Sequence, residues 1–146
     1  MTETVELYVP ARAEYLQLVR VVVGAVAAAD PEMVPDRASN LRLAVSEAVS
    51  NAIRAQEKFR ISDRITIRCN LAEGFIEVEV SDHGPGFDPA ELPDLPAVES
   101  RERLHHESGL GLYLMRKLTD ETTIESGSRG TAVKLVTRYK EGLQNA

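Results

Sequence analysis

The stretch from Phe75 to Phe87 constrains the fold most strongly, because it joins a strand pattern to a glycine-rich exit. Along Phe75–Val80 apolar residues alternate with glutamates, which is the pattern of a half-buried β-strand. By this alternation, Asp82 falls on the same face of the strand as the buried side chains. A carboxylate at such a position is costly unless it accepts hydrogen bonds, for example from an amine on a ligand. Gly84 and Gly86 then allow a sharp turn and a flat ligand close to the main chain. This predicts the floor of a pocket, and a simple strand-to-loop exit through an Asp-Gly turn is the alternative.

Composition favours one compact domain whose partners are proteins or small molecules. The 146 residues, of which 43% are hydrophobic and 27% charged, suit a single domain over residues 1–146 with a buried core. Acidic side chains outnumber basic ones, 23 to 17, and the formal net charge of −6 opposes non-specific attraction to nucleic acid or anionic lipid. We therefore expect no direct nucleic-acid binding and no membrane association.

The cysteine content and the apolar runs indicate a cytoplasmic protein. Cys69 is the only cysteine, so no internal disulfide can form, and its place in an alternating run predicts a small buried side chain. The longest apolar run, from Leu18 to Ala29, is interrupted by Arg20 and is too short to cross a bilayer. No cationic leader precedes it, so export is not expected.

Periodicity along the rest of the chain predicts helices and strands in an α+β order. The expected elements are an edge strand at Val5–Val9, helices at Glu14–Ala29, Asp36–Arg54 and Leu110–Leu118, and two hairpins, formed by Arg64–Leu71 with Phe75–Asp82 and by Thr122–Ser126 with Thr131–Arg138. Residues 88–107 contain several prolines and no sustained periodicity, which predicts a long loop that is either functional or disordered.

Glu47 and Asn51 lie four residues apart on the second expected helix and therefore share a face, one turn apart. A carboxylate and an amide oxygen stacked in this way could position a hydroxyl or a water and hold a hard divalent ion, because magnesium takes oxygen ligands. The same spacing is common on exposed helix faces, so a solvated helix surface is the alternative.

Two further features each allow two interpretations. Arg20 lies beside a valine stripe on the first expected helix, where an arginine is either solvated or anchors a protein partner. Gly109 and Gly111 stand at the start of the third expected helix, where exposed backbone N–H groups and the helix dipole can hold phosphates. The alternative for these glycines is a hinge or a close helix contact at Gly111.

The order of these motifs resembles that of the Bergerat-fold, or GHKL, ATPases, which include gyrase and the histidine kinases. Glu47-Ala-Val-Ser-Asn51-Ala resembles their N box, Asp82-His-Gly84-Pro-Gly86-Phe their first glycine box, and Gly109-Leu-Gly111-Leu their second. The opening Val-Pro-Ala-Arg-Ala-Glu-Tyr-Leu and the run from Ser108 to Glu121 are similar to the bacterial anti-sigma factor serine kinases of the RsbW and SpoIIAB type. This resemblance spans nearly the whole chain.

For the fold, the resemblance implies an α+β two-layer sandwich, in which a mixed but mostly antiparallel sheet is covered on one face by about three helices. Residues 88–108 would be a lid over bound ATP. Several relatives have a histidine after the N-box asparagine, and some have an arginine before the second glycine box, where this chain has Ala55 and Glu107. Arg101 or Arg103 in the lid could supply that charge to the γ-phosphate.

For the nucleotide base, the resemblance implies recognition by the first glycine box. Asp82 would accept a hydrogen bond from the adenine amino group, assisted through water by Thr131. Gly84 and Gly86 would line the base.

For the phosphates, the resemblance implies ATP with Mg²⁺ and one acidic catalytic residue. Asn51 would bind the magnesium ion that bridges the phosphates, and Glu47 would be the general base toward a serine or threonine hydroxyl. Phosphate would be cradled by the backbone of Gly109, Leu110, Gly111 and Leu112. Phosphoryl transfer needs chiefly positioning and charge neutralisation, so this small set of groups is chemically sufficient.

For the function, the resemblance implies an ATP-dependent serine/threonine protein kinase that is also an anti-sigma factor. Such a kinase holds a sigma factor away from RNA polymerase until an unphosphorylated anti-anti-sigma protein of the STAS type displaces it and is itself phosphorylated. Arg20 matches a helix arginine implicated in partner contact, and the edge strand Val5–Val9 offers a place for a homodimer contact. Two alternatives stay open: a nucleotide-binding regulator without kinase activity, and a regulator of the same fold whose client is not a sigma factor.

Overall fold

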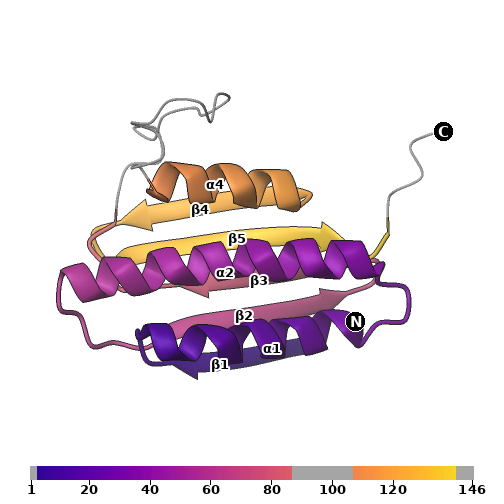
Figure 1. The fold of residues 1–146 in the computed structure, drawn as a ribbon, viewed down its shortest axis with the longest axis horizontal. Helices are drawn as coiled ribbons and strands as arrows, with labels where there is room; N and C mark the ends of the chain where they lie inside the picture. Colours follow the sequence, from indigo (N-terminus) through magenta and orange to yellow (C-terminus); the bar gives the residue numbers. More distant parts are fainter. Residues whose placement is uncertain (1–2, 87–106, 141–146) are drawn as a thin grey trace.

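The computed structural model of the chain describes residues 3–86 and 107–140. In chain order its elements are β1 (Glu3–Val9), the 3-10 turn η1 (Ala13–Tyr15), α1 (Leu16–Ala28), α2 (Pro35–Lys58), β2 (Ile65–Ala72), β3 (Phe75–Ser81), α4 (Glu107–Leu118), β4 (Glu121–Gly127) and β5 (Gly130–Arg138). The strands form a five-stranded sheet in the order β1-β2-β3-β5-β4. Figure 1 shows α1, α2 and α4 side by side across one face of this sheet, with α2 in the middle.

The predicted two-layer α+β architecture is confirmed, and the pairing of the described strands refines it. β2 and β3 form one antiparallel hairpin and β4 and β5 form the other. The two hairpins meet through an antiparallel contact between β3 and β5, and β1 pairs antiparallel with β2 at the far edge. The sheet in the described ranges is therefore antiparallel throughout, which corrects the expectation of a mixed sheet.

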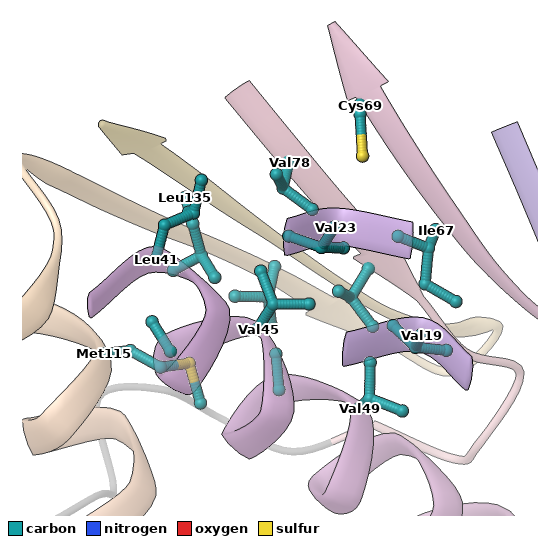
Figure 2. Packing of buried hydrophobic residues seen from close by; sticks show 14 of the residues in the cluster. Val19, Val23, Leu41, Val45, Val49, Ile67, Cys69, Val78, Met115 and Leu135 are labelled. Atoms are coloured by element: carbon teal, nitrogen blue, oxygen red, sulfur yellow. The ribbon is translucent and has the colours of Figure 1, made fainter. Parts of the chain in front are cut away.

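The core lies between the sheet and the helices, because each central strand turns alternate side chains toward the helical layer. Along β2, Ile65, Ile67 and Cys69 are buried while the residues between them are half-buried. Figure 2 shows Ile67 and Cys69 with valines of α1 and α2 and with Met115 of α4 in one cluster. The prediction of a small buried side chain at Cys69 is confirmed, and burial raises the pKa of its thiol to about 11.

The opposite face of the sheet carries polar side chains and ion pairs. Arg68 of β2 contacts Glu6 of β1 at 2.9 Å, and Lys134 of β5 contacts Glu79 of β3 at 3.8 Å. Both pairs bridge neighbouring strands and are partly exposed, so each contributes at most about 1 kcal/mol. The strand alternation thus separates a core face from a charged outer face.

All three described helices differ from the prediction. α1 begins at Leu16, because the predicted first residues form the 3-10 turn Ala13–Tyr15. α2 continues one turn past its predicted end and reaches Lys58, because Gln56 in that turn is buried. α4 begins at Glu107, before its predicted start, so the last two residues of the predicted lid, Glu107 and Ser108, belong to this helix. Residues 88–106 of the predicted lid lie outside the described residues. Within the described ranges, no helix has the length and apolar character needed to span a membrane.

Candidate functional site

One face of α2 carries the two polar side chains predicted to act at the phosphates. Glu47 and Asn51 are both half-buried and lie one turn apart. Both reach α4 at Gly111: a Cβ built on this glycine would lie 3.2 Å from Asn51 Nδ2 and 3.2 Å from Glu47 Oε2. A side chain at position 111 would therefore crowd both groups, and the glycine lets the two helices approach this closely.

The Asn51 side chain is oriented by a charged neighbour. Arg54 donates from Nη2 to Asn51 Oδ1 at 2.5 Å, so the amide oxygen faces the guanidinium and the amide nitrogen faces Gly111. An amide oxygen has two lone pairs, so Oδ1 can also bind a hard cation. Amide and carboxylate oxygens one turn apart fit magnesium, which binds few protein oxygens and takes phosphate and water as its other ligands.

Asp82 stands at the exit of β3, where its backbone and its carboxylate are both anchored. Its N–H donates to the carbonyl oxygen of Thr131 on β5 at 2.9 Å. Its Oδ1 accepts from the N–H of Gly84 at 2.8 Å and from that of Thr131 at 3.3 Å. Within the described part of the chain both donors use Oδ1, which leaves Oδ2 for a donor on a ligand.

Partial burial disfavours the ionised form of the Asp82 carboxyl. Burial raises the pKa of its carboxyl above the ordinary aspartate value, while hydrogen bonds from Gly84 and Thr131 and the charge of His83 act in the opposite direction. The ionised carboxylate is therefore poorly solvated. A hydrogen bond from a ligand amine would offset this cost, which fits the prediction of a pocket at this place.

Two glycines with positive φ hold the β4–β5 turn against the exit of β3. At Gly86, where φ is 80°, a Cβ would lie 2.2 Å from the carbonyl oxygen of Gly127. At Gly130, where φ is 138°, a Cβ would lie 2.0 Å from the carbonyl oxygen of Asp82. Both positions reject a side chain on steric and conformational grounds, so the first glycine box and the last hairpin are fixed against each other.

Ala55 connects this exit to α2. A Cβ built on Gly84 would lie 3.2 Å from Ala55 Cβ, and Ala55 follows Asn51 by one helical turn. Glu47, Asn51 and Ala55 therefore form a continuous line of side chains, which we call the α2 stripe. The stripe contacts α4 through its first two residues and the first glycine box through its third. The structure thus brings the three predicted boxes together along one helix.

The other predicted nucleotide-site residues lie near the ends of this stripe. On α4, Leu112 is buried and Leu110 half-buried. Gly109 belongs to the first turn of that helix, where backbone N–H groups have no partner within a helix. On β5, Thr131 is buried, and its Oγ1 lies 2.7 Å from Ser126 Oγ.

Arg20 is not part of this cluster, and the two lid arginines lie outside the part of the chain that the structure describes. Arg20 is half-buried on α1, which lies on the other side of α2 from α4 (Figure 1). Arg101 and Arg103, the proposed source of charge for the γ-phosphate, lie outside the described residues. The structure therefore leaves the roles of these arginines as predictions.

Sequence reasoning missed two residues that contact the site. Gln56 is fully buried on α2 and accepts a hydrogen bond from the N–H of His83 at 2.8 Å. A signal existed, because Gln56 continues the apolar spacing of Ala52 and a polar residue at a core position needs a partner. Ser126 pairs with Thr131 across the β4–β5 hairpin, and nothing in its local sequence marks it.

The fold and the three boxes define a class, the histidine kinase-like ATPase domains, and residues 9–137 match the family of that description. The chain is 33% identical to the serine-protein kinase RsbW of Bacillus subtilis strain 168, over 94% of this chain and 86% of that protein. It is also 33% identical to the serine-protein kinase RsbW of Staphylococcus epidermidis, over 97% of this chain and 91% of that protein. The chain therefore belongs to the RsbW family of serine-protein kinases. The predicted class, an ATP-using protein kinase of the anti-sigma, partner-switching type, is confirmed by this membership.

Two solved structures share the fold. The structure of the RsbU and RsbW domains of a Mycobacterium tuberculosis protein matches with a TM-score of 0.68 at 20% identity, over 93% of this chain and 32% of that chain. The present chain thus spans about a third of that polypeptide. The SiaB–SiaC complex of Pseudomonas aeruginosa matches with a TM-score of 0.61 at 12% identity, over 90% of this chain and 88% of that chain. At these identities the likeness concerns the fold alone.

Proposed function

We propose that this kinase transfers the γ-phosphate of magnesium-bound ATP to a serine or threonine of a STAS-type anti-anti-sigma protein, and that it otherwise sequesters a sigma factor. The observation that carries the proposal is the α2 stripe, Glu47, Asn51 and Ala55, which touches α4 and the first glycine box along one helix face. One rigid helix can thereby position both ends of a nucleotide. Phosphoryl transfer depends chiefly on such positioning and on charge neutralisation.

The adenine base would bind at the exit of β3. Asp82 Oδ2 would accept from the adenine amino group, because Oδ1 already accepts two backbone N–H groups. The hydroxyl of Thr131 would assist through a water, and Gly84 and Gly86 would line the base. Small residues on this wall, including Ala55, would let a flat ring lie close to the main chain.

The phosphates would bind between α2 and the start of α4. Asn51 Oδ1 would coordinate the magnesium ion, which neutralises phosphate charge when it is bound. The first turn of α4, with Gly109, would donate backbone N–H groups to phosphate oxygens, and Leu110, Gly111 and Leu112 would hold that turn against α2. The contact of Gly111 with the α2 stripe sets the distance between these two groups of donors and acceptors.

Glu47 would act as the general base. Its Oε2 faces the same part of α4 as the Asn51 amide, so a substrate hydroxyl entering next to the γ-phosphate would come within reach of this carboxylate. Glu47 would take the hydroxyl proton as the oxygen attacks phosphorus, while the bond from phosphorus to the ADP oxygen breaks.

The proposed partner surface is the outer side of α1. Arg20 is half-buried there, and Leu18 and Val21 on the same helix are 46% and 57% exposed. Arginine beside exposed apolar side chains is typical of protein contact sites. We expect the sigma factor or the STAS protein to contact this surface.

For assembly, the proposal includes one domain over residues 1–146, with residues 88–106 as the lid region before α4, in a cytoplasmic homodimer. β1 lies at the edge of the sheet, and Val5–Val9 would form the contact between two copies.

The decisive experiment for the proposed function is a transfer assay with γ-labelled ATP, magnesium and candidate STAS proteins. We expect label on a serine or threonine of one STAS protein, and we expect Glu47→Ala to lower the transfer rate by about a hundredfold or more while nucleotide binding changes little. Tight nucleotide binding without any transfer would favour the alternative, a regulator that sequesters its partner without phosphorylating it. Capture of sigma factors in the presence of ATP would separate a sigma client from another client.

A further inference from the structure

Gln56 is a fully buried amide at the end of α2 nearest to Asp82, with an exposed fraction of 0%. Its Oε1 accepts from the N–H of His83 at 2.8 Å. Its Nε2 donates to the carbonyl oxygen of Asp63 at 2.6 Å and, with a longer contact of 3.4 Å, to that of Ile61. The carboxamide therefore joins α2, the segment between α2 and β2, and the residue that follows Asp82.

The bond to His83 fixes the peptide that follows Asp82. The N–H of Asp82 itself donates to the carbonyl oxygen of Thr131 on β5. Asp82 is thus held from β5 on one side and from α2 on the other. Asp63, which lies between α2 and β2, also contacts His83 directly: the imidazole Nδ1 of His83 lies 3.6 Å from Asp63 Oδ2.

The buried amide of Gln56 contributes to stability, and it also orients the peptide groups that it contacts. Replacing a buried hydrogen-bonded pair by apolar groups costs little stability when both partners are replaced. The partners of Gln56 are backbone groups, which remain when the side chain is changed. What the carboxamide adds is direction, because its donor and its acceptor each demand one orientation of a peptide group. The peptide that it orients carries the proposed base-reading carboxylate.

We propose that Gln56 is a positioning residue that fixes the Asp82 carboxylate for the adenine amino group and thereby sets the base selectivity of the kinase. The inference rests on the proposed function, in which Asp82 reads the base. Rotation of the peptide between Asp82 and His83 would move the carboxylate and break its bond from Gly84, so the amino group of adenine would lose its acceptor.

The test compares two ligands by calorimetry in the presence of magnesium: ADP, and the diphosphate of purine riboside, which lacks the 6-amino group. We expect the wild-type protein to bind ADP about tenfold more tightly or better, as for a hydrogen bond to a charged group. Gln56→Met keeps the length of the side chain and removes the strong donor and acceptor, so we expect the ratio of the two Kd values to fall to about one. Gln56→Glu, whose neutral form is favoured by burial, keeps an acceptor for the N–H of His83 and an O–H donor for the carbonyl oxygen of Asp63, and is expected to retain most of the ratio.

The matched control is Tyr139→Phe. Tyr139 is also buried and donates from its hydroxyl to the carbonyl oxygen of Ala72 at 2.8 Å, at the opposite end of β3 from Asp82. This variant should lower the thermal midpoint and leave the Kd ratio at the wild-type value. A ratio that falls in Tyr139→Phe as far as in Gln56→Met would mean that selectivity follows stability, and would overturn the inference.

The remaining outcomes separate the inference from the proposed function. A high ratio in the wild type that persists in folded Gln56→Met would overturn the role of Gln56 and leave the role of Asp82 intact. A wild-type ratio of one would overturn both. If Gln56→Met does not fold, the Kd ratio of Gln56→Glu is measured together with amide exchange at the N–H of His83. A lost Kd ratio in a variant whose His83 N–H stays protected would overturn the inference. A retained Kd ratio with that protection would support it.

Discussion

Gly111 of α4 lies so close to Asn51 of α2 that a single methyl group on the glycine would come within 3.2 Å of the amide nitrogen. The same methyl group would lie 3.2 Å from Glu47 Oε2. One helix contact therefore fixes the proposed metal ligand, the proposed base and the proposed phosphate-binding helix relative to one another. Both side chains are half-buried, so an added methyl group would displace them from their present positions.

The first prediction concerns this contact. Gly111→Ala should lower phosphotransfer by about tenfold or more, because small displacements of positioned groups strongly reduce the rate. The measurement is the transfer rate at saturating ATP. The matched control is Gly24→Ala on α1, where a Cβ would meet the side chain of Arg42 at 3.4 Å. An exposed, flexible neighbour can move aside, so Gly24→Ala should leave transfer unchanged and raise the free energy of unfolding by up to about 1 kcal/mol. Equal transfer rates in the two variants would contradict the proposed geometry.

The second prediction separates stability from binding at Asp82. Burial raises the pKa of this carboxyl in the folded state, so the wild-type protein loses stability as the pH rises from the ordinary aspartate pKa through the raised value. Asp82→Asn removes the ionisation, and we expect it to be at least as stable as the wild type at neutral pH. The same variant should lose nucleotide affinity by about a hundredfold, because the charged acceptor for the amino group is gone. Denaturation curves at several pH values and calorimetry with ATP check both parts, and unchanged ATP affinity would count against the assignment.

The third prediction concerns the turn against the first glycine box. Gly86→Ala should lower the free energy of unfolding by about 2 kcal/mol or more, since a Cβ there meets the Gly127 carbonyl oxygen at 2.2 Å and φ is 80°. Gly74→Ala is the control, because φ is 87° but no atom lies within 4 Å of the added Cβ. Gly74→Ala should lower the free energy of unfolding by about 1 kcal/mol, from the strained backbone conformation alone. Chemical denaturation measures the free energy of unfolding of both variants. Equal losses in the two would show that the close approach of Gly86 to Gly127 does not add to the cost of the side chain.

The fourth prediction concerns the thiol. Cys69 is buried and the pKa of its thiol is raised to about 11, so alkylation at neutral pH should follow unfolding of the core and not simple exposure. We expect labelling by iodoacetamide to be slower in the native protein than in denaturant by about a thousandfold or more. Rapid labelling of the native protein would show that β2 opens easily.

Much of the fold follows from the sequence because strand alternation and helix periodicity are local signals. The alternation of Ile65, Ile67 and Cys69 determined both the strand and its buried face. The end of α2 was predicted one turn early, because the polar residue Gln56 ended the apolar pattern although its partners bury it. Those partners lie on segments that only the tertiary structure brings together.

The site was less accessible to sequence reasoning than the fold. Glu47 and Asn51 could be placed on one helix face from their spacing, but their contact with Gly111 depends on how α4 packs against α2. The contact between Gly86 and Gly127 likewise joins two segments far apart in the sequence. The roles assigned to individual residues stay predictions, and the lid arginines lie outside the described residues.

The most direct test of the proposed site is a crystal structure with magnesium and a non-hydrolysable ATP analogue. We expect the adenine amino group within hydrogen-bonding distance of the Asp82 carboxylate, and the metal ion on Asn51 Oδ1 beside the phosphates. A nucleotide bound elsewhere, or side chains filling the space along the α2 stripe at saturating ligand, would contradict the proposed site.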